Sequence, residues 1–104
     1  MPNFVFAYHG GKAPESPEEG AKAMEQWKAW FGDLGAAVVD PGNPVGMSKT
    51  VTAKGVEDNG GANPISGFSV VSAPDMSAAV KMAKGCPMVA DGSGSVEVAE
   101  VHQM

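Results

Sequence analysis

The clearest hydrophobic pattern in the chain is the helical one between Ser16 and Leu34. At 100° per residue its apolar positions fall within an arc of about 80°, as in a helix with one face in a core. The arc holds Gly20, Met24, Trp27, Phe31 and Leu34, with Ala23 and Trp30 on its flank. Ser16 and Glu19 have the spacing of a capping box, and Pro17 suits the first helical position. The pattern predicts an amphipathic helix that buries Trp27 and Phe31.

Four other segments have the composition and spacing of β-strands bounded by turn residues. They are 3–9 (NFVFAYH), 36–39 (AAVV), 65–72 (ISGFSVVS) and 95–101 (SVEVAEV). A second helix is expected to begin after Asp75, its N-cap, and to end at Gly85. The segment 48–54 alternates weakly, which is typical of an exposed edge or hairpin strand, whereas 55–64 is rich in glycine and asparagine and is expected to be a loop.

In chain order these elements are a strand, a helix, two strands, a helix and a strand. This order is the split βαβ or ferredoxin-like plan, an α+β fold in which an antiparallel sheet carries both helices on one face. We expect residues 1–104 to form a single domain of this kind.

The pattern of the first strand indicates that the sheet face without helices is also apolar. Val5 and Ala7 alternate with Phe4, Phe6 and Tyr8, so one apolar row remains on the face without helices. Soluble monomers rarely leave such a surface in water. We therefore expect a homodimer in which two sheets pack face to face. The alternative is that the segment 48–64 folds over this face.

Charge and composition exclude several classes of partner. The net charge is −5 and the 7 Lys and Arg residues form no run, which argues against nucleic acid and against anionic membrane surfaces. No purely apolar run, 36–39 included, is long enough to cross a membrane, and no signal-peptide pattern is present, so we expect a cytoplasmic protein. The single Cys86 cannot form an internal disulfide. Neither a metal-ligand spacing nor a nucleotide-loop motif occurs, so no metal and no cofactor is expected.

Candidate chemistry centres on His9 and Asp40. Both follow predicted strands that run parallel on either side of 65–72, and we expect them to lie roughly 10 Å apart at one sheet edge. A small substrate could bridge them, with His9 as general base and Asp40 as the orienting carboxylate. The alternative is that His9 is a solvated strand end and Asp40 a turn residue before proline.

Four further residues are candidates for the wall of a substrate pocket between helix and sheet. They are Tyr8, Met24, Trp27 and Met47. Aromatic rings supply large apolar surfaces, and methionines adapt to irregular ligands. Plain core packing is the alternative interpretation of the same residues.

The chain resembles the YCII-related family, including the branch named for its DGPF motif. The resemblance is carried by FVFAYHGG, by M-x-x-W-x-x-W-F-x-x-L-G in the first helix, by GFSVVSAPDMSAAVKMAKGCP and by the terminal VEVAEV. It implies a dimeric α+β barrel. Many members carry an acid-base histidine early in the first helix, where this chain has Met24, and the DGPF tetrapeptide is replaced by EDNGGANPISG.

Two classes of function remain open from the sequence. One is a small-molecule-binding or regulatory dimeric α+β barrel, favoured by the loss of the helix histidine. The other is an isomerase or lyase that acts on a small ring-derived metabolite, as the resemblance implies. The placement of His9 beside Asp40, or of both in bulk water, is the feature that distinguishes them.

Overall fold

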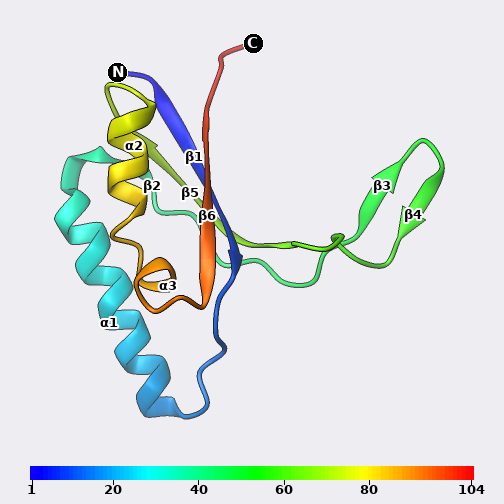
Figure 1. The fold of residues 1–104 in the computed structure, drawn as a ribbon, viewed down its shortest axis with the longest axis horizontal. Coiled ribbons are helices and arrows are strands. Elements are labelled where there is room, and N and C mark those ends of the chain that lie inside the picture. The colour runs from blue at the N-terminus through cyan, green and yellow to red at the C-terminus, as the bar shows by residue number, and fades with distance from the viewer.

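A computed structural model describes the whole chain, residues 1–104. Its elements are β1 (Asn3–Gly10), α1 (Pro17–Leu34), the short 3-10 helix η1 (Gly35–Ala37), β2 (Val38–Asp40), β3 (Thr50–Thr52), β4 (Gly55–Glu57), β5 (Ile65–Ser72), α2 (Met76–Ala83), α3 (Pro87–Ala90) and β6 (Gly94–Glu100). Four strands form an antiparallel sheet in the order β2-β5-β1-β6, and the helices lie on one side of it (Figure 1). This arrangement confirms the ferredoxin-like α+β fold.

Local side-chain contacts at the helix ends agree with the predicted caps. Ser16 Oγ accepts the backbone N–H of Glu19 at 3.1 Å, and Asp75 Oδ1 accepts that of Ala78 at 2.8 Å. The Glu19 carboxylate accepts the N–H of Glu15, one residue before the position that a complete capping box would use. Gly35 ends α1 with a φ of 57°, a conformation that glycine adopts without strain.

The buried face of α1 differs from the predicted one. Trp30 is the buried residue of this helix, with 6% of its surface exposed, whereas Trp27 and Phe31 are half-buried and Met24 is exposed. The indole of Trp30 stacks on Phe6 and donates its Nε1–H to the carbonyl of Met82 at 3.1 Å. The core side of the helix is therefore rotated toward Trp30, which contacts Phe6 of β1 and Met82 of α2.

Alternation along β1 divides its residues between the two sheet faces. Phe4, Phe6 and Tyr8 are buried beneath the helices, together with Val71 of β5. The other face carries no helix, and we call it the open face. Its apolar residues on the two central strands are Val5, Ala7, Phe68 and Val70, which are partly buried, and Ile65, which is exposed.

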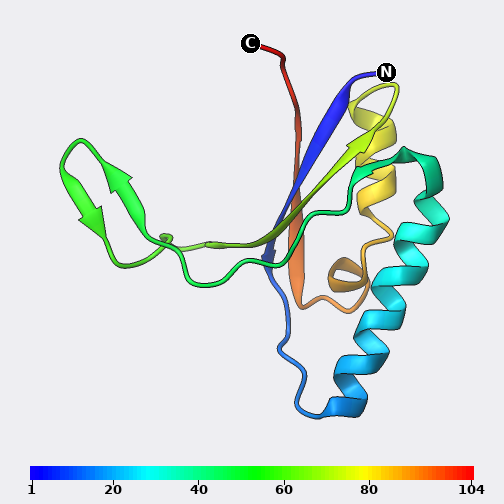
Figure 2. The same ribbon diagram turned by 180° about the vertical axis from the view of Figure 1, so that it is seen from behind.

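Two predicted segments are corrected by the structure. Residues 36–39 were expected to be a strand, but η1 occupies their first half, and β2 begins only at Val38. Residues 55–64 were expected to be a loop, but Gly55–Glu57 forms β4, which pairs with β3 in a separate two-stranded sheet. This hairpin extends away from the body of the protein on the side opposite the helices (Figures 1 and 2).

Candidate ligand pocket

A pocket of about 700 Å³ lies between α1, the end of β1 and the loop that follows β2. We call it the α1 pocket. Four aromatic residues and two methionines are among the residues that line it: Tyr8, Trp27, Phe31, Phe68, Met24 and Met88. Tyr8 and Trp27 meet edge to face, with ring centroids 5.1 Å apart. The volume and the apolar wall are typical of sites that bind small organic molecules.

The loop 41–45 forms the wall opposite α1 and is fixed to β5 by its backbone. Phe68 N donates to Asn43 O at 3.2 Å, and Val45 N donates to Ser66 O at 3.0 Å. Gly42 has a φ of 69°, and a Cβ at this position would overlap the backbone carbonyl of Phe68. Glycine is therefore required for the close approach of this loop to β5.

The hydroxyl of Tyr8 is part of a buried hydrogen-bond chain behind the pocket. Tyr8 Oη donates to Ser69 Oγ at 2.7 Å, and Ser69 Oγ donates to Pro41 O at 2.6 Å. Burial raises the pKa of Tyr8 to about 12, although the hydrogen bond to Ser69 acts in the opposite direction. Tyr8 is thus a neutral donor that ties β1 to β5 and to the start of the loop. The sequence analysis did not identify Ser69. Its only indication there is that a polar residue occupies a position that alternation places on the buried face of the strand.

A bulge in β5 places one unsatisfied polar group at the pocket. Tyr8 pairs with Gly67 and His9 pairs with Ile65, so Ser66 is an extra residue on β5. Ser66 lines the pocket, and its Oγ is buried without a hydrogen-bond partner. A buried hydroxyl without a partner costs about 1–3 kcal/mol, and a polar group brought to Ser66 would remove that cost.

The ionisable residues that line the pocket are Tyr8 and Lys12. Lys12 Nζ lies 3.5 Å from Glu19 Oε1, and both side chains are substantially exposed to solvent. Lys12 therefore places a positive charge at the rim. The wall itself contains no carboxylate, imidazole or thiol that could act as a general base.

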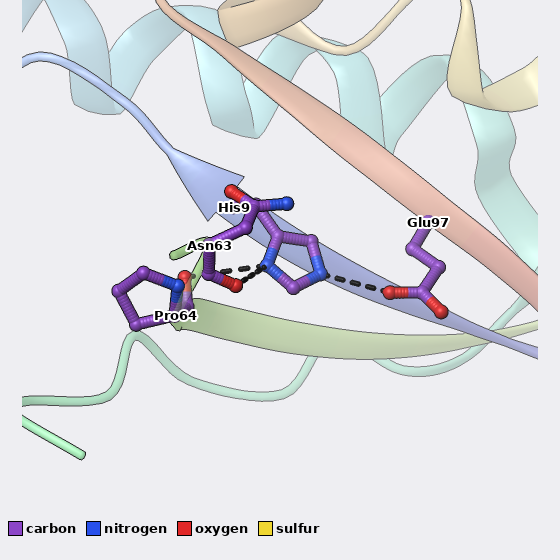
Figure 3. A network of polar contacts seen from close by, with 4 residues as sticks. All are labelled: His9, Asn63, Pro64 and Glu97. Atoms are coloured by element: carbon purple, nitrogen blue, oxygen red, sulfur yellow. Dashed lines mark hydrogen bonds and ion pairs between the residues drawn. The ribbon is translucent and has the colours of Figure 1, made fainter. Parts of the chain in front are cut away.

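His9 lies on the open face, not in the α1 pocket, because neighbouring residues of a strand point to opposite faces. Its side chain is 12% exposed. Nδ1 lies 2.9 Å from Asn63 O and 3.2 Å from Pro64 O, and Nε2 lies 3.0 Å from Glu97 Oε1 (Figure 3). These partners are all acceptors, so the ring satisfies them only as an imidazolium that donates from both nitrogens.

The pKa of His9 reflects these contacts. Partial desolvation lowers the pKa, but hydrogen bonds to Glu97 and to the carbonyls of Pro64 and Asn63 outweigh it, and the pKa is raised above 6.5. With both nitrogens occupied, His9 has no free lone pair for a substrate proton. Glu97 carried no signal in the sequence, since 88 residues separate it from His9.

The predicted spacing between His9 and Asp40 is wrong. In the sheet register His9 pairs with Ile65 and Asp40 with Val70, which separates them by roughly 16 Å along β5 alone. The prediction assumed that Asp40 ends its strand at the same edge as His9, but β2 ends opposite Val70, and the residues after Asp40 continue along β5 as far as the bridge between Pro44 and Gly67. Asp40 Oδ1 instead accepts the N–H of Gly42 at 2.8 Å, as a turn residue does.

Of the four residues predicted to line a substrate pocket, three do so. Tyr8, Met24 and Trp27 meet at the α1 pocket, whereas Met47 is fully exposed and lies outside it.

Cys86 is buried, and burial raises the pKa of its thiol. The structure contains no cluster of three potential metal ligands. None of its helices combines the length and the hydropathy that crossing a membrane requires.

Comparison with known proteins gives a similarity in fold but none in sequence family. No family model and no curated protein matches the sequence, so the resemblance to the YCII-related family stays a prediction. The fold is similar to that of 5-chloro-2-hydroxyhydroquinone dehydrochlorinase (TftG) from Burkholderia phenoliruptrix AC1100, solved in complex with 2,5-dihydroxybenzoquinone. The TM-score is 0.58 at 15% sequence identity, and the match covers 96% of this chain and 95% of that one. At this identity, the similarity concerns the fold.

Proposed function

We propose that this protein binds a small, flat, mostly apolar ring molecule in the α1 pocket. The observation that carries the proposal is the wall of the pocket, where the rings of Tyr8, Trp27 and Phe31 surround a volume suited to one small organic ligand. Two polar features favour a ring with oxygen substituents. Ser66 offers a hydroxyl without a partner, and Lys12 places a positive charge at the rim.

Binding without catalysis is the better supported of the two functions that the sequence left open. Acid-base chemistry on a ring needs a group that accepts a proton near neutral pH. Tyr8 has a pKa of about 12 and has its proton committed to Ser69, while His9 lies on the open face with both nitrogens occupied. Met24 stands where many YCII-like proteins have a histidine, and a thioether cannot transfer a proton.

A lyase or isomerase of small ring compounds is the second candidate. It is favoured by the similarity in fold to a dehydrochlorinase bound to 2,5-dihydroxybenzoquinone. In this case the proton acceptor would be a substituent of the substrate or a water molecule, because the wall of the α1 pocket supplies none. Turnover of hydroxylated quinones, followed by their absorption spectrum, separates this candidate from simple binding.

We also propose that the protein is a homodimer through its open face. Val5, Ala7, Phe68 and Val70 give this face an apolar centre that water would cover in a monomer. Light scattering at micromolar concentration measures the assembly directly. A molar mass of twice 10.6 kDa supports the dimer, and the monomer mass contradicts it.

The two tryptophan indoles provide a sharp test of binding. Trp27 lines the α1 pocket, whereas the Nε1–H of Trp30 is bonded to Met82 O within the core. In proton–nitrogen correlation spectra, titration with 2,5-dihydroxybenzoquinone and related hydroquinones should shift the Trp27 indole signal in a saturable way and leave that of Trp30 nearly unchanged. Trp27→Phe and Trp30→Phe assign the two signals.

The same titration shows what contradicts the proposal. If no member of the panel shifts the Trp27 signal, or if the shifts cluster on β6, the α1 pocket is not the ligand site. Ser66→Ala is the matched variant for the polar contact. This substitution should lower the affinity for rings with oxygen substituents and leave the affinity for an unsubstituted ring unchanged.

A further inference from the structure

The hairpin β3–β4 and its flanks, residues 46–64, form an extension that we call the arm. The arm adds no strand to the main sheet, and it leaves the body on the open-face side (Figures 1 and 2). Val51 and Val56 are directly opposed across the hairpin and are 75% and 63% exposed. Met47 is fully exposed. A two-stranded hairpin with uncovered apolar side chains is marginal in water by itself.

The arm nevertheless has a defined shape, set by its own polar contacts. Lys49 Nζ lies 2.6 Å from Asp58 Oδ1, and Thr50 Oγ1 donates to Asn59 O at 2.6 Å. These contacts join the two flanks of the hairpin. A shape that exists before binding lowers the entropy lost when a partner is engaged.

The base of the arm is fixed to the sheet by His9. The imidazolium holds the carbonyls of Asn63 and Pro64 on one side and the Glu97 carboxylate of β6 on the other (Figure 3). The residue opposite His9 on β5 is the uncharged Ile65. This junction joins β1, β6 and the last residues of the arm. The direction in which the arm leaves the sheet is therefore set by contacts inside the chain.

The surface of the chain is larger than one compact domain requires. A folded monomer of 10.6 kDa exposes roughly 5,500 Å². This chain exposes 7111 Å², an excess of about 1,600 Å² over that expectation. Its radius of gyration is 14.8 Å, against roughly 13 Å for a compact domain of this length. Two copies together carry an excess of about 3,200 Å², within the range of about 2,000–5,000 Å² that obligate dimers bury.

We propose that the arm packs against the open-face side of a second copy of this chain. This inference rests on the homodimer proposed above and adds the arm as the element that holds it together. The arm and the open face lie on the same side of the molecule, so a two-fold axis brings each arm to the partner's sheet and doubles the contact. Val51 and Val56 then lose their exposure to water.

Sedimentation equilibrium of the full chain and two variants tests the proposal. The double variant Val51→Thr and Val56→Thr keeps β-branched residues in the hairpin and removes two apolar contacts. It should raise the dimer dissociation constant about tenfold or more. The control is Val80→Thr on α2, a valine that is 38% exposed on the helical side, and it should leave the constant within about twofold of the original.

Hydrogen exchange of the arm amides supplies the second readout and distinguishes the possible failures. Exchange in 50–57 should slow as protein concentration rises through the dissociation constant. A dimer whose constant is unchanged by the double variant, with arm exchange independent of concentration, overturns the role of the arm and leaves the dimer standing. A chain that stays monomeric at all concentrations overturns both, and the ligand titration of Trp27 still decides the function of the α1 pocket.

Discussion

Replacing Trp30 with alanine should destabilise the protein far more than the same change at Trp27. Trp30 is 6% exposed and fills the space between Phe6 and α2, and its indole packs so closely on Gly85 that a Cβ there would lie 3.2 Å from the ring. Truncating a buried tryptophan costs about 3–5 kcal/mol, and the lost indole hydrogen bond adds about 1 kcal/mol. We expect Trp30→Ala to lower the free energy of unfolding by about 4–6 kcal/mol.

Trp27 makes fewer contacts with the core. One side of its ring faces the α1 pocket, so the truncation enlarges an existing space instead of opening a closed cavity. We expect Trp27→Ala to cost about 1–2 kcal/mol. The free energy of unfolding of a domain is about 5–15 kcal/mol in total. The Trp27 variant should therefore stay folded, while the Trp30 variant should lose most of its stability.

Urea unfolding followed by far-ultraviolet circular dichroism measures both losses. All variants are compared at one protein concentration, because association would contribute to the apparent stability. Trp30→Phe is the conservative control: it keeps a ring against Phe6, loses the donor to Met82 O, and should lie between the original protein and Trp30→Ala. Equal losses at both positions, or a larger loss at Trp27, would refute the assignment of the helix face.

Three further outcomes are expected. Ser16→Ala should lower the free energy of unfolding by about 0.5–2 kcal/mol in the same assay, since Glu19 N–H loses its acceptor, and Ser77→Ala should change it less. The pKa of His9 is raised in the folded protein, so its contribution to stability is complete below pH 6.5 and disappears as the pH rises through the folded-state pKa. The difference in free energy of unfolding between the original protein and His9→Gln should therefore shrink with rising pH. A difference that grows would contradict the imidazolium assignment. Cys86 should react slowly with a chromogenic disulfide reagent in the native protein and rapidly in concentrated guanidinium, and rapid native reaction would show that the thiol is accessible.

The features that the sequence predicted well are those set by neighbours within a few residues. Ser16 and Asp75 cap their helices because a short side chain reaches a backbone N–H three residues away, and such contacts are written into local spacing. The alternation of β1 likewise placed Phe4, Phe6 and Tyr8 on one face. Because the helices and strands were predicted in the correct order along the chain, the ferredoxin-like fold could be predicted from that order.

The features that the sequence could not predict depend on contacts between distant segments. The helical arc of α1 was found, but its centre depends on where α2 packs, and nothing near Trp30 indicates Met82. The partner of His9 was likewise undetermined, because Glu97 and the carbonyl of Asn63 reach it only through strand register and the course of the arm. Of the six predicted site residues, three lie at the α1 pocket, and they belong to the two strongest local patterns: Tyr8, Met24 and Trp27.

The attachment of the loop 41–45 to β5 bears on how this protein can change in evolution. The course of the loop is fixed by main-chain hydrogen bonds and by the absence of a side chain at Gly42, neither of which depends on the side chains of Asn43 and Val45. Those two side chains belong to the pocket wall, and they can vary without displacing the backbone that carries them. A mutational scan should accordingly find Gly42 intolerant of every replacement and its two pocket-lining neighbours permissive. Selection can then alter which ring the pocket accepts while the scaffold of the wall stays constant.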